Sequence, residues 1–530
     1  MADDHASKSI SCYGAGINHT PNIDRLATEG MKFNHCYVTN SICTPSRASI
    51  LTGTYNHVNG VMTLDNHVCV TPAETNTAAF ADLSDVQINK HIPNVAKHLR
   101  TGDYQTAMVG KWHLGEGRAH EPTGFDYWSV LPGQGEYWDP EFIEPAGPKI
   151  ETGYVTDIIT DKCLDWIKGR DTSQPFFLMC HHKAPHRSWE CDDKHKHLYK
   201  DPIKLPDTFT DDYKNRAKAA RVAKIRVVED MTYQDLGLVQ PEGGRWVGER
   251  VQQEKGASER KIPIPSDAEL KDFKLIDKES GQTFTFSSQS QLGEFKYQRY
   301  MQRYLRTIQS IDDNVGRLLD FLDADPSLRN NTIVIYTSDQ GFFLGEHGWF
   351  DKRFMYEESF QMPFLIRYPA EIPAGTVCND IISNVDFAPT WLDFARLPIP
   401  NYMQGVTFRP LLRSGKAPAS WQQIAYHRYW MHNDIIHQAY AHYGIRNHRY
   451  KLIYWYNEDL GVEGARPGAA DEKEWELFDC VEDPLELFNV YNDVKYQDVV
   501  REMTALLEKK MVEIGDEPVH PRVLRRTLKI

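Results

Sequence analysis

Three apolar segments of this chain end directly in charged or polar side chains. Residues 105–109 run into Lys111, residues 175–180 run into a group of histidines, and residues 333–336 end at Asp339. Buried strands that deliver polar groups at their carboxyl ends are typical of α/β sheets, whose ligands bind in the crevice beyond those ends. The sequence therefore predicts an α/β fold with a single site built from several strand ends.

A fourth segment, residues 41–53, predicts a loop followed by a short helix. Thr44 is placed to cap the helix, a proline suits the next position, and Gly53 ends it. Cys43 is then expected at the positive end of the helix dipole with Arg47 one turn on, a setting that lowers the pKa of a thiol. A buried structural cysteine is the alternative, because free cysteines are among the most buried residues.

The sequence Cys43-Thr-Pro-Ser-Arg, followed by Leu-Thr-Gly, resembles the signature of the type I (formylglycine-dependent) sulfatases. In that family the cysteine is oxidised to Cα-formylglycine, whose hydrated aldehyde is the nucleophile. Other segments resemble the family in the same order, namely TPNIDRLA at 20–27, GKWHLG at 110–115, APH at 184–186, SDQG at 338–341 and a closing DP at 483–484. The resemblance implies an alkaline-phosphatase-like α/β/α sandwich with a large mixed sheet and a smaller C-terminal α+β subdomain.

The resemblance also implies a divalent cation. In the family an acidic pair at the end of the first core strand binds the metal, and Asp3 and Asp4 match that pair. Asp339 matches a third carboxylate, and Gln340 stands where many members have asparagine, so it keeps the amide oxygen on a longer side chain. Together with the modified Cys43, these hard oxygen ligands suit Ca²⁺, with Mg²⁺ as a second possibility.

Catalytic roles carry over from the family position by position. Lys111 and Lys352 match lysines that bind sulfate, and Arg47 would steady the nucleophile. His186 would protonate the leaving alcohol, and His113 would deprotonate the remaining hydroxyl, which expels sulfate and restores the aldehyde.

Two further sets of histidines are candidate site residues, namely His347 and the three histidines that follow residues 175–180. His347 lies in the Gly-Glu-His-Gly stretch, typical of carbohydrate-active members, and is expected to contact substrate together with Lys111, His186 and Lys352. The histidines at 181, 182 and 186 suggest a zinc site as an alternative. That site is disfavoured because no further ligands follow at zinc spacing.

The expected substrate rests on resemblance. Residues 122–128, 131–135 and 345–353 look most like carbohydrate sulfatases of the N-acetylglucosamine-6-sulfatase kind, which act on 6-sulfated N-acetylglucosamine in glycosaminoglycans. Such an enzyme needs a formylglycine-generating enzyme as a partner during maturation. A phosphodiesterase or phosphonate monoester hydrolase of the same superfamily is the alternative, and an inactive sugar-binding relative is a third.

Composition narrows the class of protein. A net charge of −14 argues against a nucleic-acid binder and favours short, exo-cleaved oligosaccharides over internal attack on polyanions. No apolar run approaches the ~20 residues that span a membrane. The nine cysteines form no C-x-x-C pair, and their odd number fits one being reserved for chemistry.

The 530 residues exceed the ~250–300 that one core usually serves, so two units are expected. Residues 1–415 are predicted to form the catalytic domain, with a charged, partly flexible insertion at 190–290. Residues 416–530 are predicted to form an antiparallel-sheet subdomain, with a hairpin at 443–454 and a terminal helix.

The start of the chain is unusual for the family. An apolar strand normally precedes the acidic pair, whereas only Met1 and Ala2 precede it here. We therefore expect the natural product to begin upstream. These first residues lack the pattern of a signal peptide, and relatives are often periplasmic, secreted or lysosomal, so the compartment stays open.

Overall fold

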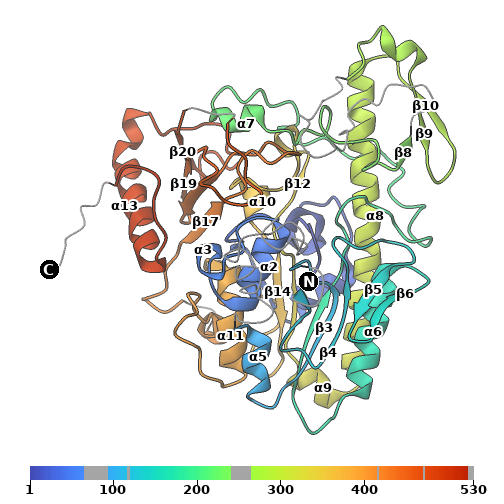
Figure 1. Ribbon diagram of the computed structural model, residues 1–530, viewed down its shortest axis with the longest axis vertical. Coiled ribbons are helices and arrows are strands. Elements are labelled where there is room, and N and C mark those ends of the chain that lie inside the picture. Colours follow the sequence, from blue (N-terminus) through green and yellow to red (C-terminus); the bar gives the residue numbers. More distant parts are fainter. Residues whose placement is uncertain (65–92, 116–119, 240–263, 415–416, 469–471, 523–530) are drawn as a thin grey trace, which may run out of the picture.

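Two sheets form the centre of the computed structural model, which describes residues 1–64, 93–115, 120–239, 264–414, 417–468 and 472–522 (Figure 1). The five-stranded sheet has the order β6-β5-β4-β3-β7 and the four-stranded sheet the order β11-β14-β1-β15. Their strands are β1 (Met31–Phe33), β3 (Gln105–Lys111), β4 (Tyr127–Leu131), β5 (Glu141–Glu144), β6 (Gly147–Ile150), β7 (Phe176–His181), β11 (Val334–Thr337), β14 (Phe364–Arg367) and β15 (Thr376–Cys378). The three strands predicted from apolar runs are confirmed as β3, β7 and β11.

Met1 and Ala2 connect the two sheets. The amide of Ala2 donates to the carbonyl of Thr337 at the end of β11 at 3.0 Å. On the other side, the amide of His182 beyond β7 donates to the carbonyl of Met1 at 2.9 Å. The two sheets thus form one mixed central layer, and Asp3 and Asp4 emerge at its strand ends.

Alternation along the strands explains the helical layers on either face. Met108 of β3 packs in the same apolar cluster as Val95 and Phe387, while its neighbour Val109 packs with Ile159 and Ile311 on the other face. One face is therefore covered by α2, α5 and α11 and the other by α1, α6 and α8. These helices are α1 (Pro21–Thr28), α2 (Cys43–Thr52), α5 (Val95–Arg100), α6 (Val155–Gly169), α8 (Gln289–Asp323) and α11 (Phe387–Phe394).

Gly110 allows β3 to pass close to β7 just before Lys111. Its φ is +98°, and a Cβ at this position would lie 2.0 Å from the carbonyl oxygen of His181. Only glycine fits such a contact. The end of β3 is thereby held against the end of β7, and the residues after both strands meet.

The described parts of the insertion contribute α7 (Lys218–Val222) and a small sheet of β8 (Leu238–Val239), β9 (Lys274–Asp277) and β10 (Thr283–Thr285). Helix α7 packs into the main core through Ala219 and Ala220, whereas the small sheet and the segment before it pack on α8. Met231, Leu236 and Leu275 are buried together with Tyr300 and Tyr304 of α8. The glycine-rich stretch for which flexibility was predicted lies largely in 240–263, outside the described residues.

A separate antiparallel sheet lies at the opposite side from α8 (Figure 1). Its order is β17-β18-β19-β20, with strands β17 (Ala425–Tyr429), β18 (His442–Arg446), β19 (Tyr450–Trp455) and β20 (Glu474–Asp479). The register pairs Arg446 with Lys451 across a tight turn, which confirms the predicted hairpin. Helix α13 (Gln497–Ile514) packs on this sheet through Met503 and Leu507.

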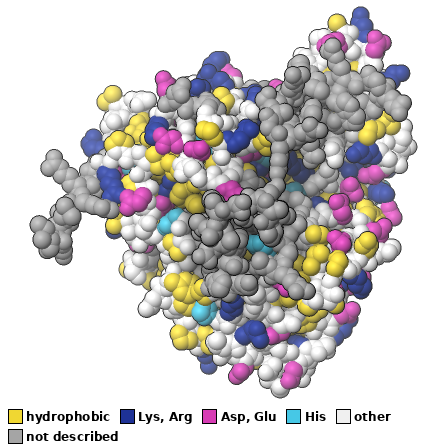
Figure 2. Space-filling model, viewed as in Figure 1, with side chains coloured by type: hydrophobic (Ala, Val, Ile, Leu, Met, Phe, Trp, Pro, Cys, Tyr) yellow, Lys and Arg dark blue, Asp and Glu magenta, His cyan; other side chains and the backbone are white. Residues whose placement is uncertain are grey.

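The remaining elements are short. They comprise α3 (Asn56–Asn59), α9 (Pro326–Asn331), α10 (Glu357–Phe360), α12 (Arg409–Ser414) and the strand pairs β2 (Cys36–Tyr37) with β16 (Ile382–Ser383) and β12 (Phe343–Leu344) with β13 (Phe350–Asp351). On the face shown in Figure 2, basic and acidic side chains are interspersed wherever side chains are coloured. Among the helices that the structure describes, none is both long enough and apolar enough to cross a bilayer.

Candidate active site

Helix α2 begins two residues earlier than predicted. Cys43 is its first residue, Ile42 precedes it without a side-chain cap, and Thr44 lies inside the first turn. The hydroxyl of Thr44 instead donates to the carbonyl of His113 at 3.0 Å. The predicted cap is therefore wrong, because Thr44 finds a better partner across the site, whereas the predicted stop at Gly53, with φ of +66°, is confirmed.

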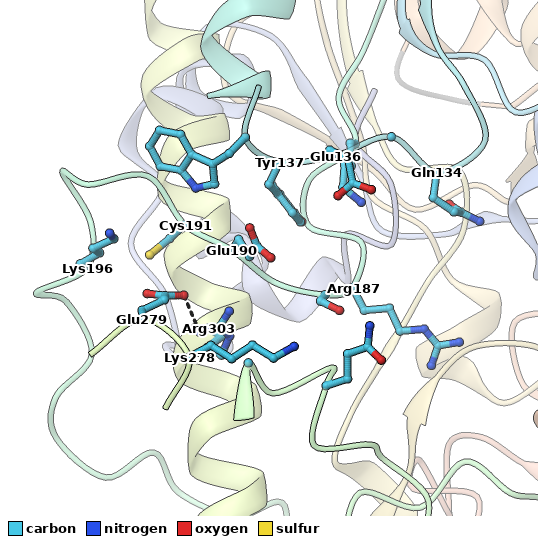
Figure 3. A pocket seen from close by; sticks show the side chains of 16 residues that line it. Gln134, Glu136, Tyr137, Arg187, Glu190, Cys191, Lys196, Lys278, Glu279 and Arg303 are labelled. Carbon is cyan, nitrogen blue, oxygen red and sulfur yellow. Dashed lines mark hydrogen bonds and ion pairs between the residues drawn. The ribbon is translucent and has the colours of Figure 1, made fainter. Parts of the chain in front are cut away.

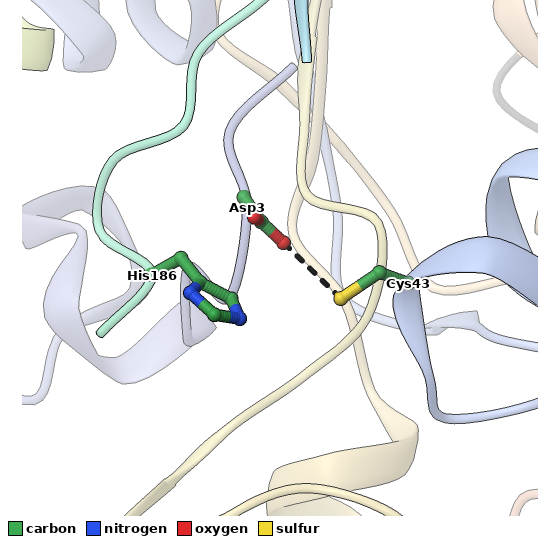
Figure 4. A group of neighbouring side chains, drawn as sticks. All are labelled: Asp3, Cys43 and His186. Atoms are coloured by element: carbon green, nitrogen blue, oxygen red, sulfur yellow. Dashed lines mark hydrogen bonds between the residues drawn. The ribbon is translucent and has the colours of Figure 1, made fainter. Parts of the chain in front are cut away.

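Cys43 faces Asp3 and His186 at the bottom of the site. Its Sγ lies 3.3 Å from Oδ1 of Asp3, and one ligand atom from each of the three residues lies within 4.8 Å of the others. Figure 4 shows Asp3 between the other two side chains. Burial raises the pKa of the Cys43 thiol well above its ordinary value, and the Asp3 carboxylate adds to the effect. The predicted lowering is therefore wrong: desolvation outweighs the helix dipole, and the unmodified thiol stays protonated.

Three carboxylates converge beside Cys43. Oxygens of Asp3, Asp4 and Asp339 lie within 4.8 Å of one another, and each side chain is at most 1% exposed. Burial raises the pKa of Asp4 to about 7, with Asp3 and Asp339 adding to the rise and Lys352 opposing it. Burial and Asp3 likewise raise the pKa of Asp339. Like charges held this close disfavour joint ionisation unless a cation binds among them.

Gln340 adds a further oxygen to this group. Its Nε2 donates to Oδ1 of Asp4, while its buried Oε1 has no hydrogen-bond partner among the described residues. A buried carbonyl oxygen without a partner is uncommon and indicates a missing ligand. An oxygen-only donor set of this kind fits Ca²⁺ or Mg²⁺.

The histidines after β7 do not form a zinc site of their own. Nδ1 of His181 lies 3.3 Å from the carbonyl of Lys111, and Nε2 of His182 lies 3.7 Å from Sγ of Cys180. Within the described residues, the groups that could hold a metal are the three aspartates and the set of Asp3, Cys43 and His186.

Three cationic side chains face the carboxylates. Nζ of Lys111 contacts Asp3, and Nζ of Lys352 lies 2.5 and 2.7 Å from the two oxygens of Asp4. Arg47 donates to Asp339 at 2.9 Å and to the carbonyl of Lys111 at 2.7 Å. Burial opposes the charge on Lys352, but Asp4 outweighs it and raises the pKa of this lysine above its ordinary value. The structure therefore brings all the predicted charged residues into one cluster.

The two predicted catalytic histidines contact different parts of the cluster, His186 beside Asp4 and His113 beside Thr44 and Gln134. Nε2 of His186 is 3.7 Å from Asp4, and its Nδ1 is 2.6 Å from the carbonyl of Arg187, so Nδ1 carries the proton of the neutral ring. Burial, and then Lys111, lower the pKa of His186 well below its ordinary value. His113 has a positive φ of 54°, a strained backbone that is often found at functional sites.

His347 is placed differently from the other predicted residues. It is 1% exposed, its Nδ1 lies 3.0 Å from Asp211, and its ring packs against Trp349 and Tyr356. In this structure it orders the loop before β13. Its contact with substrate stays a prediction, without support from its position.

Sequence reasoning missed several residues that line the cluster. The side-chain amide of Gln134 accepts from Lys111 and lies 3.3 Å from Nε2 of His113. Its loop, residues 131–135, was noted for its resemblance to carbohydrate sulfatases, but the residue itself carries no motif. His437, from the loop between β17 and β18, lies 2.6 Å from Asp351, the neighbour of Lys352. Nothing in the sequence pairs two residues that lie so far apart in the chain.

The family model described as Sulfatase matches residues 1–397, and the model described as N-sulphoglucosamine sulphohydrolase, C-terminal, matches residues 345–513. The chain belongs to the sulfatase family. This sulfatase is a sulfuric ester hydrolase with the alkaline-phosphatase-like fold that the sequence predicted, and the mixed central sheet and the separate C-terminal sheet are the elements of that fold.

Relatives of known activity support this placement. The sulfatase is 40% identical over 527 residues to an N-acetylglucosamine-6-O-sulfatase of Bacteroides thetaiotaomicron, covering 97% of this chain and 86% of the relative. It also resembles the solved structure of BT4656 in complex with its substrate D-glucosamine-2-N,6-O-disulfate, with a TM-score of 0.79, 38% identity and 97% of both chains covered. The phosphonate monoester hydrolase of Agrobacterium radiobacter shares the fold at a TM-score of 0.66 and 18% identity, over 97% of this chain and 94% of the other.

Proposed function

We propose that this sulfatase hydrolyses the 6-O-sulfate ester of glucosamine-type sugars, such as 6-sulfated N-acetylglucosamine, using a formylglycine at position 43 and a Ca²⁺ or Mg²⁺ ion. The observation that carries the proposal is the convergence of Cys43 with three carboxylates, two lysines and two histidines at one strand-end site. The relatives named for N-acetylglucosamine-6-O-sulfatase activity and for a disulfated glucosamine substrate support the choice of sugar.

The cation would be held by Asp3, Asp4, Asp339 and Gln340, together with the modified residue 43. This assignment is supported by the raised pKa values of Asp4 and Asp339 and by the unpartnered Oε1 of Gln340. When bound, the ion supplies positive charge for sulfate oxygens and for an oxygen nucleophile. Lys111 and Lys352, which contact Asp3 and Asp4, would bind the sulfate oxygens with their ammonium groups.

Residue 43 would act as formylglycine, whose hydrated aldehyde supplies an oxygen nucleophile. The protonated state of the buried Cys43 thiol supports this role over direct thiolate attack, since only the thiolate is strongly nucleophilic. Arg47 would hold Asp339 and the end of β3 in place through its hydrogen bonds.

His186 would carry the proton to the leaving sugar oxygen. Its Nδ1–H donates to the Arg187 carbonyl, so Nε2 faces the cluster and must take up a second proton before the ring can act as the acid. Burial, which lowers the pKa of His186, opposes this protonation, and the negative charge of a bound sulfate would favour it. His113 would accept a proton from the remaining hydroxyl on residue 43. The contacts of His113 with Thr44 and Gln134 keep its ring beside the start of α2.

The experiment has two parts. Tryptic mass spectrometry of the active protein should find an aldehyde-bearing residue at position 43. Full turnover by protein with an unmodified thiol would contradict the assignment of formylglycine as the nucleophile. A panel of defined substrates should then show sulfate release from 6-sulfated N-acetylglucosamine well above release from 3-sulfated isomers.

The metal is tested in the same assay. Activity should be lost on chelation and return with Ca²⁺ or Mg²⁺. Recovery with Zn²⁺ alone would contradict the oxygen-ligand site and move the metal to the histidines. A phosphonate monoester belongs in the panel, because the shared fold alone does not separate the two chemistries, and faster cleavage of the phosphonate would reverse the proposal.

A further inference from the structure

A cavity lies on the side of α8, next to the group of active-site residues that we call the catalytic cluster. This cluster comprises Asp3, Asp4, Cys43, Arg47, Lys111, His113, His186, Asp339, Gln340 and Lys352. The cavity has a volume of about 440 Å³, within the range of pockets that hold small ligands (Figure 3). Gln134 lines it and also contacts Lys111 and His113, so the cavity begins where the catalytic cluster ends. The opposite wall comes from the insertion and α8, through Lys278, Glu279 and Arg303.

The wall near the catalytic cluster carries groups that match sugar hydroxyls. Glu136 and Glu190 supply carboxylate oxygens as acceptors, and the buried Lys183 supplies an ammonium donor over the ring of Tyr137, 4.6 Å from its centroid. Trp138, which is 37% exposed, adds an indole to the lining. Alternating donors and acceptors beside an exposed aromatic ring suit a polyhydroxylated ring better than a bare polyanion.

The far wall carries cationic groups with unused donors. Arg303 is 7% exposed and uses Nη1 for Glu279 at 3.0 Å, which leaves Nη2 without a hydrogen bond among the described residues. Lys278, next to Glu279, is exposed at the mouth of the cavity. An anionic oxygen could therefore accept from Arg303 and Lys278 without breaking the ion pair that is already formed.

We propose that this cavity is a second saccharide subsite, and that it holds an acidic sugar unit next to the sugar that loses its sulfate. The acidic group, a carboxylate or a sulfate, binds Arg303 and Lys278, while Glu136, Glu190 and Lys183 bind hydroxyls of the same unit. The inference rests on the proposed function for its orientation toward the catalytic cluster. It makes the preferred substrate at least a disaccharide, and it assigns the insertion a role in specificity.

The test compares 6-sulfated glucosamine with three disaccharides that contain it: one with a uronic acid, one with a sulfated hexosamine and one with a neutral hexose. Wild-type kcat/KM should be at least about tenfold higher for an acidic disaccharide than for the neutral one, because charge-assisted hydrogen bonds are the stronger kind. Comparison of the uronic-acid disaccharide with the sulfated-hexosamine disaccharide shows whether the subsite prefers a carboxylate or a sulfate. Arg303→Gln and Lys278→Gln should each remove most of this preference, mainly through KM.

Arg317→Gln is the matched control, since Arg317 also lies on α8 and pairs with a carboxylate, Asp161, but is 43% exposed on another part of the helix. It should keep the full preference. If Arg303→Gln does not fold because the buried arginine is lost, Lys278→Gln still tests the subsite. Equal kcat/KM for acidic and neutral disaccharides, or equal losses on monosaccharide and disaccharide in both variants, would overturn the subsite.

A binding measurement separates this inference from the proposed function. Calorimetry with the sulfate-free uronic-acid disaccharide should show tighter binding to the wild type than to Arg303→Gln, whether or not sulfate is released. Failure to hydrolyse any 6-sulfated sugar would count against the proposed function, whereas equal binding to the two proteins would count against the subsite.

Discussion

Two buried charge clusters of this sulfatase differ in how their charges are arranged. In the catalytic cluster, the carboxylates of Asp3, Asp4 and Asp339 converge on one point, and each also contacts a cation. Burial raises the pKa values of Asp4 and Asp339, whereas at Asp3 burial is outweighed by Lys111 and the other cationic neighbours, which hold the pKa well below its ordinary value. In the second cluster, between α10 and the C-terminal sheet, charges of opposite sign alternate. Glu357 lies 3.0 Å from both Arg446 and Lys451, and Lys451 lies 2.5 Å from Glu486.

The second cluster also contains carboxylates whose pKa values move in opposite directions. Burial alone would raise the pKa of Glu357, but Arg446 and Lys451 hold it below its ordinary value. Burial does raise the pKa of Glu486, which Lys451 only partly offsets. Alternating charges stabilise one another, whereas converging like charges stay unfavourable until a ligand arrives. The comparison teaches that arrangement matters: three carboxylates of the first cluster share one point at which a cation could bind, whereas in the second cluster cations stand against the carboxylates.

The largest expected effect comes from Asp4→Asn in the catalytic cluster. The variant should lose at least about 10³-fold in kcat, because removal of a catalytic ligand disables a unit whose members act together. The folded pKa of Asp4, about 7, lies above its unfolded value, so the native carboxyl retains its proton while the unfolded one loses it. Stability due to Asp4 therefore falls as pH rises from about 4 to 7.

In cation-free protein at pH 8, Asp4→Asn should consequently raise the melting temperature, and the gain should vanish below pH 4. Thermal melts in chelator across this pH range provide the measurement. If the variant melts at a lower temperature than the wild type at pH 8, the attraction between Asp4 and Lys352 outweighs the repulsion between Asp4 and the other two carboxylates. The two clusters would then not differ in this respect.

His186→Ala should produce the next largest effect. Sugar sulfates have poor leaving groups and should lose about 10²–10⁴-fold in kcat, since that is what general acid catalysis typically contributes. Aryl sulfates, whose phenolate leaves without a proton, should lose far less. Steady-state kinetics on both substrate types measure the gap, with the exposed His448→Ala as control. Equal losses on the two types would remove His186 from the acid role.

Glu357→Gln tests the second cluster. Glu357 is half-buried, but its removal leaves the buried Arg446 and Lys451 less compensated, so the free energy of unfolding should fall by about 1–3 kcal/mol. The turnover number should stay within about threefold of the wild type. Urea denaturation measures the free energy of unfolding, and steady-state kinetics measure the turnover number. Glu482→Gln, at an exposed position, is the control. A large fall in kcat without a loss of stability would assign this cluster to catalysis.

The smallest effect concerns the pH dependence of cation binding. Because Asp4 is protonated below about pH 7 in the cation-free protein, a cation must displace that proton. Calcium affinity should therefore fall by about tenfold for each pH unit below 7 and change little above it. Calorimetric titrations at pH 6, 7 and 8 measure the slope, and an affinity independent of pH would mean that Asp4 is not a ligand.

The local sequence determined much of this protein. Apolar runs followed by Lys111, the histidine group and Asp339 predicted the three strands and the edge at which they end, because burial and strand direction are local properties. The resemblance around Cys43 predicted the family and the residues of the charged cluster. The hairpin at 443–454 was equally local, since alternating aromatic residues on both sides of a short turn suffice to predict it.

Only the tertiary structure determined the features that depend on contacts between distant residues or on burial away from water. The pKa of Cys43 rises because α2 is buried against Asp3, which a helix dipole viewed alone does not reveal. His347 turns toward Asp211 because the folded insertion presents that partner. Arg303 and Gln134 line one cavity only because the fold brings α8 and the loop after β4 to its two sides. Such contacts join residues far apart in the chain, and no local pattern encodes them.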